Sequence, residues 1–352
     1  MEFEIQSSKS DVTLLLLTKD RLRFLKRWVE FYFDTGIGYP AIIADGSISN
    51  SREDFLNIDI LDKRLSYIHI GPDVNLTAYM AKSIQALSLV KTKYTIMLSD
   101  DDFFSNSAIN TGSNFLDNNL EFVLSYNLAI DFGLSIRPSE ENSYGGKIRY
   151  IRRMPELKAI EGDTPYSRIL EYLEYYPSYW HSVVRTESLL AAWKEAQLLD
   201  FSRADTLELF LNIYLLTAGK FNSGAEQIIL FHQVHGNMLA QSLESNIDRI
   251  KNPSWIKEIR IIENYLTKKY YLDLNSEFQI MFRKVFLENS GISGKAQKNK
   301  SNIVIRYFKA FSFKYSQLTN YEPKLTNLEL VPESSRIEFE NIQNFLLKYK
   351  EK

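Results

Sequence analysis

The chain has 352 residues, of which 45% are hydrophobic and 24% are charged, and its formal net charge is −2. This is the composition of a folded globular protein with enough apolar residues for one large domain or two smaller ones. A net charge so close to zero gives no reason to expect a nucleic-acid partner. The sequence contains no cysteine, which excludes disulfides, thiolate metal sites and a cysteine nucleophile.

The start of the chain is unlike a targeting segment. It reads MEFEIQSSKSD, which is acidic and polar, whereas a signal peptide begins with a basic stretch. The apolar run Val12–Leu17 is far shorter than the ~20 residues that a helix needs to cross a bilayer. We therefore expect a cytoplasmic protein without a transmembrane segment, attached at most to the inner face of the cell membrane.

Strand-like and helix-like segments alternate in the first third of the chain. Short apolar runs without polar alternation are typical of strands that are buried on both faces. The predicted elements are, in chain order, a strand over Val12–Thr18, a helix over Arg21–Tyr32, strands over Tyr39–Ala44 and Leu65–Ile70, a helix over Ala78–Val90 and a strand over Tyr94–Leu98. This alternation predicts an α/β fold with a mixed, mostly parallel sheet flanked by helices.

The same pattern continues to about residue 237 and then changes to helices alone. Further strands are predicted over Phe122–Asp131, Lys147–Arg153 and Ile228–Val234, and further helices over Thr164–Tyr175, Glu187–Ala196 and Thr206–Ala218. The later segments with helical spacing are Trp255–Lys269, Ser276–Leu287, Ile303–Phe313 and Ser335–Lys348. We therefore predict an α/β domain over residues 1–237 and a helical C-terminal region over residues 238–352.

Three consecutive carboxylates, Asp100, Asp101 and Asp102, end the predicted strand in the sequence YTIMLSDDDFF. Like charges at the end of a buried strand repel one another, so such a cluster needs a cation or abundant water. Oxygen ligands suit Mg²⁺ or Mn²⁺, and these ions commonly hold phosphates. The alternative is a solvated acidic loop that caps a helix beginning near Ser105.

Other polar residues also lie at the carboxyl ends of predicted strands. Thr18 and Asp45 follow the first and second predicted strands, as the carboxylate cluster follows the fourth. Ligands of such sheets bind beyond the carboxyl ends of the strands. The sequence thus predicts a metal-assisted nucleotide or phosphate site at this edge.

Several motifs in this order resemble a known family. They are TKDRLRFLKRWVEFY after the first strand, IIADGS at the second, IMLSDDDFF at the fourth, and then ADTLELF and GKFNSGAEQIILFHQVH. Over residues 11–237 the chain resembles family 2 glycosyltransferases, nucleotide-sugar transferases with the Rossmann-like GT-A fold. Two departures are visible: Asp20 stands where the motif Thr-x-Asn-Arg has Asn, and Ser99 takes the first place of Asp-x-Asp-Asp.

The resemblance implies a reaction and a set of binding residues. The enzyme would move a sugar, with inversion, from a nucleotide-diphosphate donor (UDP-sugar favoured) to a hydroxyl group of a glycan or lipid-linked glycan, in surface polysaccharide biosynthesis. It would use Mn²⁺ or Mg²⁺. The residues implied in donor binding are Thr18, Asp45, Lys82 and Asp100, and those implied in metal binding are Asp101, Asp102 and His235. His235 is preferred to His232, although a structural histidine is an equal alternative.

The resemblance also implies that Asp205 is the general base. A base takes the proton of the acceptor hydroxyl as its oxygen attacks the anomeric carbon. Asp205 and Glu208 also read as a capping pair that opens the following helix. Similarly, Asp45 and Gly46 are a turn signal, and Lys82 has the alternative of an ordinary surface lysine.

Two aromatic segments each allow more than one interpretation. Tyr179 and Trp180 are candidates for an acceptor site because sugars stack on aromatic rings, but dense aromatic residues more often form a core. The basic and aromatic segment Arg283–Lys314 is a candidate for peripheral contact with an anionic membrane, or for an ordinary packed helix. The aromatic C-terminal region is also a candidate interface, so a homo-oligomer is among the partners considered.

Two other classes of function stay open at this point. A metal-dependent nucleotidyltransferase would share the sheet and the acidic ligands, but it usually shows a glycine-rich phosphate loop, and residues 12–21 contain no glycine. The other class is a non-catalytic protein that binds a sugar or a partner on the same fold.

Overall fold

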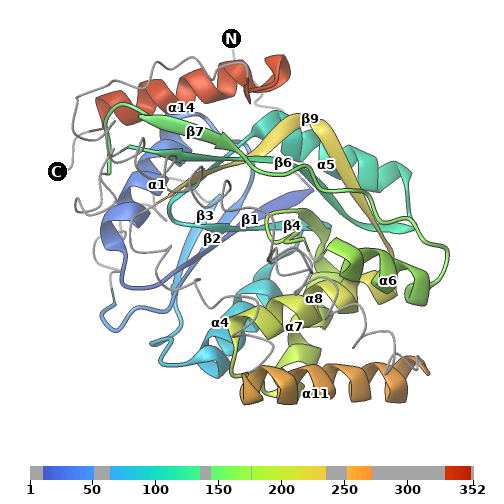
Figure 1. Cartoon of the computed structure of the whole chain (residues 1–352). Coiled ribbons are helices and arrows are strands. Elements are labelled where there is room, and N and C mark those ends of the chain that lie inside the picture. The colour runs from blue at the N-terminus through green and yellow to red at the C-terminus, as the bar shows by residue number, and fades with distance from the viewer. Residues whose placement is uncertain are drawn as a thin grey trace, which may run out of the picture.

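The computed structural model describes residues 11–50, 64–134, 144–175, 177–234, 252–271 and 330–349. Within them, strands and helices alternate as the sequence predicts (Figure 1). None of the described helices combines the length and the apolar character needed to cross a membrane. The predicted helices Ser276–Leu287 and Ile303–Phe313, and the segment Arg283–Lys314, lie outside the described residues.

The described strands form one mixed sheet in the order β3-β2-β1-β4-β8-β6-β9-β5, with β7 paired to β6. Their bounds are β1 Val12–Thr18, β2 Ala41–Asp45, β3 Leu65–His69, β4 Tyr94–Ser99, β5 Asp102–Phe104, β6 Phe122–Gly133, β7 Tyr150–Arg153, β8 Val183–Arg185 and β9 Lys220–Gln233. Strands β3, β2, β1 and β4 are parallel to one another. Strand β8 lies between β4 and β6 and pairs antiparallel with both. The parallel strands are buried on both faces because helices cover them, which explains their uninterrupted apolar runs.

Helices lie on both sides of this sheet. They are α1 Leu22–Asp34, α4 Leu76–Leu89, α5 Asn106–Asn118, α6 Pro165–Tyr175, α7 Thr186–Leu199, α8 Ala204–Ala218, α11 Pro253–Tyr270 and α14 Arg336–Lys348. Helices α4, α7, α8 and α11 pack side by side in one layer, and α5 and α14 lie on the other side (Figure 1). This arrangement confirms the predicted α/β class with a helix-flanked mixed sheet.

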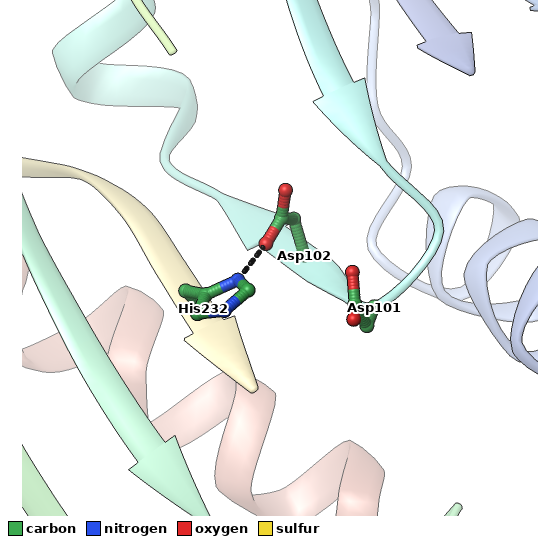
Figure 2. A group of neighbouring side chains, drawn as sticks. All are labelled: Asp101, Asp102 and His232. Carbon is green, nitrogen blue, oxygen red and sulfur yellow. Dashed lines mark hydrogen bonds and ion pairs between the residues drawn. The ribbon is translucent and has the colours of Figure 1, made fainter. Parts of the chain in front are cut away.

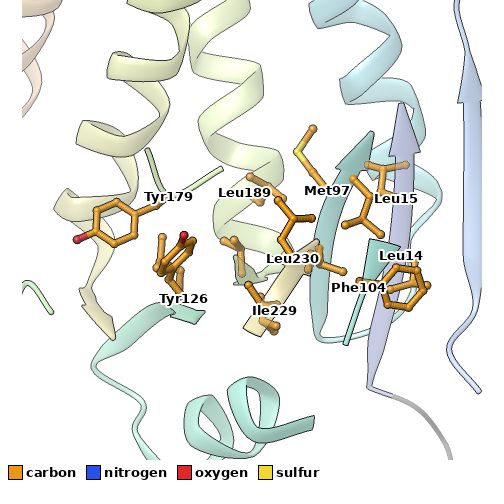
Figure 3. Close-up of a cluster of buried hydrophobic side chains, with 14 of the residues drawn as sticks. Leu14, Leu15, Met97, Phe104, Tyr126, Tyr179, Leu189, Ile229 and Leu230 are labelled. Atoms are coloured by element: carbon orange, nitrogen blue, oxygen red, sulfur yellow. The ribbon is translucent and has the colours of Figure 1, made fainter. Parts of the chain in front are cut away.

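A continuous hydrophobic core joins these layers. Figure 3 shows part of it, where Leu15 of β1 and Met97 of β4 lie near Leu189 of α7, and Phe104 of β5 lies near Leu14. Each of these side chains is at most 5% exposed. Two short strands, β5 and β8, were not expected, because three residues are too few to give a periodic pattern.

The described helices of the C-terminal region pack on the rest of the chain. Helix α11 contacts α8, and α14 places Phe345 against Phe31 of α1, with ring centroids 5.4 Å apart. Phe339 of α14 lies 5.9 Å from Phe231 of β9. Both helices therefore contribute to the main hydrophobic core, and α14 covers the strand pair β5–β9.

Candidate functional site

The carboxyl ends of the parallel strands bring the predicted polar residues together. In the register of β1 with β2, Thr18 lies beside Asp45, and in that of β1 with β4, Leu17 lies beside Ser99. The Thr18 hydroxyl donates to Asp100 Oδ2 at 2.5 Å. The expected convergence at one edge of the sheet is therefore present.

A cavity of about 790 Å³ opens at this edge. It lies between the strand ends and the N-terminal part of α8. Of the predicted site residues, four line it: Thr18, Lys82, Asp100 and Trp180. Its other polar or charged lining residues are Lys19, Arg21, Asp73, Asn75, Tyr79, Ser99, Ser202 and Glu208.

A tight turn between β4 and β5 carries the three carboxylates. The backbone N–H of Ser99 donates to Asp102 Oδ2 at 3.0 Å, which closes the turn. Each of Asp100, Asp101 and Asp102 is at most 1% exposed, so they are not a solvated loop. The reading of this cluster as a water-exposed acidic cap is therefore wrong.

Two histidines approach the cluster. His232 of β9 lies opposite Asp102 in the antiparallel pair β5–β9, and its Nδ1 is 2.7 Å from Asp102 Oδ1 (Figure 2). His181 Nε2 lies 3.8 Å from Asp102 Oδ2. The predicted ligand His235 lies outside the described residues, so its role stays a prediction.

Asp101, Asp102 and His232 form a group that could hold a metal ion. One ligand atom from each lies within 4.8 Å of the others. Two carboxylates and an imidazole suit Mn²⁺, whereas Mg²⁺ prefers oxygen ligands alone. The residues present therefore fit a divalent cation.

Arginine side chains balance much of the negative charge. Arg21 Nη1 lies 2.7 Å from Asp100 Oδ1, and its Nη2 lies 2.7 Å from Asp101 Oδ2. Arg27 is fully buried beneath the cluster, where it donates to Gln233 and, at 3.0 Å, to the carbonyl of Tyr144. Burial lowers the pKa of Arg27 to about 10.

The protonation of the cluster reflects this crowding. Burial raises the pKa of Asp100 to about 7, although Arg21 lowers it; the neighbouring Asp101 raises it further. Burial lowers the pKa of His232, but the hydrogen bond and charge of Asp102 raise it to about 9. The imidazole is therefore protonated at neutral pH in the metal-free protein, and it must release that proton to ligate a metal.

Lys82 of α4 is buried at the floor of the cavity. It is 1% exposed, its Nζ lies 2.5 Å from Asp73 Oδ2, and it donates to the Thr18 carbonyl at 3.0 Å. The alternative of a surface lysine is wrong. A Cβ on Gly46 would lie 2.2 Å from Asp73 Cγ, so glycine at this turn lets Asp73 reach Lys82.

Asp45 lies behind the cavity rather than in its lining. Its Oδ1 accepts from the backbone N–H and the hydroxyl of Ser47, at 2.9 and 2.5 Å, and its Oδ2 accepts from Tyr67 at 2.5 Å. Asp45 is 1% exposed. Its implied role in donor binding is not tested by this arrangement and stays a prediction.

Asp205 lies in the first turn of α8. Its carboxylate is paired with Arg203, with Nε 3.0 Å from Oδ1 and Nη2 2.9 Å from Oδ2. The lining residues of this helix are Ala204, Leu207 and Glu208, so Asp205 stands on the adjoining face at the edge of the cavity wall. Its catalytic role stays a prediction.

Tyr179 and Trp180 lie in different environments. Trp180 lines the main cavity and packs edge-on against Trp193, with centroids 5.8 Å apart. Tyr179 is 2% exposed, donates its hydroxyl to the Lys158 carbonyl at 2.5 Å, and lines a second cavity of about 760 Å³ near α6. Only Trp180 of this pair therefore lies beside the strand-end residues.

Three side chains of the site carry little signal in the sequence. Arg21 stands at the Arg position of the Thr-x-Asn-Arg motif after β1, but nothing in the sequence connects it with Asp100 and Asp101. Asp73 follows Gly71 and Pro72, which indicate a turn but not an ion pair. His181 ends an aromatic run, and nothing in the sequence connects it with Asp102.

Comparison with solved structures identifies a related fold. The crystal structure of S. aureus TarS 1-349 aligns with a TM-score of 0.52 and 10% identity, over 95% of this chain and 88% of that chain. TarS 1-349 in complex with UDP-GlcNAc aligns with a TM-score of 0.50 and 15% identity, over 82% and 77%. No protein-family model and no curated protein matches the sequence. The resemblance to the GT-A fold is thus confirmed at the level of the fold.

Proposed function

We propose that the protein is a glycosyltransferase that moves a sugar from a nucleotide diphosphate, with a UDP-sugar favoured, to a hydroxyl group of a glycan or lipid-linked glycan. The observation that carries the proposal is the cavity that places Thr18, Lys82 and Asp100 beside a potential metal-binding group. Its volume of about 790 Å³ suits a ligand of nucleotide-sugar size. The TarS structure with UDP-GlcNAc, which shares the fold, supports this choice of donor.

The donor end of the proposed reaction lies at the strand edge. Lys19, Arg21 and Lys82 line the cavity and supply positive charge for a diphosphate. A Mn²⁺ or Mg²⁺ ion held by Asp101, Asp102 and His232 would neutralise charge on the leaving diphosphate as a Lewis acid. Because these carboxylates are buried, their attraction to a cation is weakly screened by water.

The acceptor end of the proposed reaction lies at α8 and Trp180. Inversion needs a base on the face of the sugar opposite the leaving group, and Asp205 is our candidate. The N-terminus of α8 favours its charged form, and Arg203 fixes its orientation. Asp205 takes the proton of the acceptor hydroxyl, the oxygen bonds to the anomeric carbon, and the nucleotide diphosphate departs. Trp180 offers a flat apolar face for a sugar ring.

Thermal unfolding with nucleotides tests the donor half of the proposal. We expect one of UDP, GDP, CDP and TDP to raise the melting temperature in the presence of Mn²⁺, because a ligand that binds only the folded state stabilises it. Asp102→Asn should lose the metal-dependent part, whereas Asp205→Asn should keep it. No stabilisation by any nucleotide, with or without metal, would overturn the proposal.

Product analysis separates the remaining classes. The nucleotide that stabilises the protein is then supplied as its sugar conjugates. Hydrolysis or transfer of the sugar from one of them supports a transferase. Release of inorganic diphosphate from a nucleoside triphosphate in the presence of a sugar phosphate would instead indicate a nucleotidyltransferase. Binding without any turnover, unchanged in Asp205→Asn, would favour a non-catalytic binding protein.

A further inference from the structure

Arg21 joins the cavity to the carboxylate cluster. It directly precedes α1, lines the cavity and is 32% exposed in its side chain. Its two terminal nitrogens each lie 2.7 Å from a carboxylate oxygen, one on Asp100 and one on Asp101. The guanidinium also lies over the Phe24 ring, 4.3 Å from its centroid. The side chain is therefore held by charge on its inner side and open to the cavity on its outer side.

The ion pair of Arg21 with Asp101 would compete with a metal ion for the same carboxylate. Asp101 belongs both to the Arg21 ion pair and to the group with Asp102 and His232 that could hold an ion. A divalent cation held by Asp101 would share that carboxylate with the guanidinium, and the two positive charges would repel each other. Arginine does not lose its proton in proteins, so the repulsion is relieved by movement of the side chain.

The two arginines of the site differ in their freedom to move. Arg27 is fully buried and donates to Gln233 and to the Tyr144 carbonyl. Arg21 is one-third exposed, and its nitrogens meet only carboxylates in the contacts described above. Movement outward brings the planar fork of Arg21 into the cavity that Lys19 and Lys82 also line. Such a fork matches two oxygens of a phosphate group.

We propose that Arg21 is an exchangeable counter-cation, which holds Asp100 and Asp101 in the ligand-free protein and transfers to the donor's diphosphate when a divalent cation binds Asp101. The exchange rests on the proposed function, since it assigns Arg21 to the diphosphate of the same donor. It gives Arg21 two opposite effects: it competes with the metal when no nucleotide is present, and it strengthens binding of the diphosphate when the metal is in place.

The test uses Arg21→Met and measures two affinities on the full chain. Titration of Mn²⁺ alone, followed by the electron paramagnetic resonance signal of the free ion, should show tighter binding in the variant, by about fivefold to tenfold. Titration of UDP at saturating Mn²⁺, by calorimetry, should show binding about tenfold weaker. Uridine, which lacks phosphates, should bind the variant and the wild type equally.

Arg23→Met is the matched control. Arg23 lies two residues away in α1 and is exposed, with its guanidinium 5.7 Å from the centroid of the Tyr144 ring, so the variant removes a neighbouring positive charge of the same kind. It should leave both affinities within about twofold of the wild type. A loss of Mn²⁺ binding and of UDP binding together in Arg21→Met would show that Arg21 merely supports the structure, and unchanged affinities would equally overturn the proposal.

These outcomes are distinct from failure of the proposed function. If the wild type binds no nucleotide diphosphate in the presence of Mn²⁺, both the function and the exchange are wrong. If the wild type binds UDP and the arginine variant binds it equally well, the function stands and only the exchange is wrong.

Discussion

The two walls of the cavity are held in place by different means. The strand wall, with Thr18, Lys82 and Asp100, is fixed by its own hydrogen bonds and ion pairs between neighbouring strands and α4. The helix wall, from Ser202 to Glu208, is fixed from outside by Glu258 of α11. The comparison indicates that the strand wall is largely self-supporting, whereas the helix wall depends on a helix of the C-terminal region.

The starts of α8 and α5 are each contacted by a glutamate of a C-terminal helix, and the two can be compared. Glu258 is 4% exposed and accepts from the backbone N–H of Ser202 at 2.9 Å, from its hydroxyl at 2.5 Å, and from the Thr206 hydroxyl. Glu338 of α14 accepts from the N–H and from the hydroxyl of Ser107 at the start of α5, both at 3.0 Å, and from the Ser105 hydroxyl. Helix α5 also has its own cap, because Ser105 accepts from the N–H of Ala108 at 3.1 Å.

Helix α8 has no such local cap. Its N-cap residue is Arg203, and this side chain makes no capping hydrogen bond. Within the first turn Asp205 accepts from the backbone N–H of Thr206 at 3.0 Å, whereas the N–H and the hydroxyl of Ser202, which leads into the helix, depend on Glu258. The start of α8, where Asp205 lies, is therefore expected to respond more strongly to loss of its distant glutamate than the start of α5.

The largest expected effect is a loss of turnover in a variant of the helix wall that leaves nucleotide binding at the strand wall intact. Asp205→Asn should lower the turnover number by about 10²–10⁴, because the amide cannot take a proton from the acceptor. The dissociation constant of UDP with Mn²⁺ should stay within about twofold of the wild-type value, since Asp205 lies outside the strand wall. Steady-state rates and calorimetry measure the two quantities.

Asp102→Asn is the matched change on the strand wall. It should weaken UDP binding in the presence of Mn²⁺ by about tenfold or more, as removal of a metal ligand does. Equal losses of UDP affinity in both variants would mean that the walls do not act separately. A wild-type turnover number in Asp205→Asn would show that another group is the base.

The next effect concerns stability of the helix wall. Glu258→Ala should lower the free energy of unfolding by about 2–3 kcal/mol, because buried donors of Ser202 and Thr206 lose their acceptor. Glu258→Gln keeps an acceptor oxygen and should lose less. The exposed neighbour Lys257 provides the control Lys257→Ala, which should stay within about 0.5 kcal/mol of the wild type. Urea unfolding measures all three, and an alanine variant as stable as this control would contradict the role of α11.

A smaller effect is expected at α5. Glu338→Ala should lower the free energy of unfolding by about 1 kcal/mol, because Ser105 still caps the helix, its hydroxyl keeps Ser107 Oγ as a partner at 3.0 Å, and the half-buried Ser107 can turn to water. The same urea measurement compares it directly with Glu258→Ala. A loss larger than that of the α11 variant would reverse the proposed difference between the two helix starts.

Local patterns were sufficient for the strand wall. The apolar runs of β1, β2 and β4 and the polar residues that follow them are contiguous in sequence, and parallel strands place such ends at one edge. Thr18 and Asp100 accordingly line one cavity, and Lys82 of α4, which the family resemblance implied, lines it with them. The strands β5 and β8 escaped prediction because three residues contain no period that could be recognised.

Long-range contacts could not be derived from the same patterns. The contact of His232 with Asp102 spans 130 residues and depends on the register of β5 with β9. The contact of Glu338 with Ser107 spans 231 residues and has no trace in local propensity. Neighbours also diverge, since Trp180 faces the main cavity and Tyr179 the core. Such outcomes depend on tertiary packing, which a single sequence does not display.

The smallest expected effect is a pH dependence of stability that belongs to the strand wall. His232 has its pKa raised to about 9 by Asp102, above the 6.5 of an unfolded histidine. Its contribution is therefore complete below about pH 6.5 and is lost as the pH rises toward 9. Asp100, whose pKa is raised from 3.8 to about 7, is half ionised near pH 7 and adds a smaller fall in stability just above that pH. The histidine contributes most of the change between pH 7 and 9, and a histidine variant separates the two.

In metal-free protein kept with a chelator, we expect the free energy of unfolding to fall by on the order of 1 kcal/mol between pH 7 and 9, since the side chain is 23% exposed and partly screened. His232→Asn should be less stable at pH 7 and should lose most of this slope. His69, on β3, provides the control His69→Asn, which removes a histidine that is not in contact with Asp102 and should keep the slope. A slope that persists in His232→Asn would assign it to another group and leave the Asp102–His232 pair without a measurable share in holding β5 to β9.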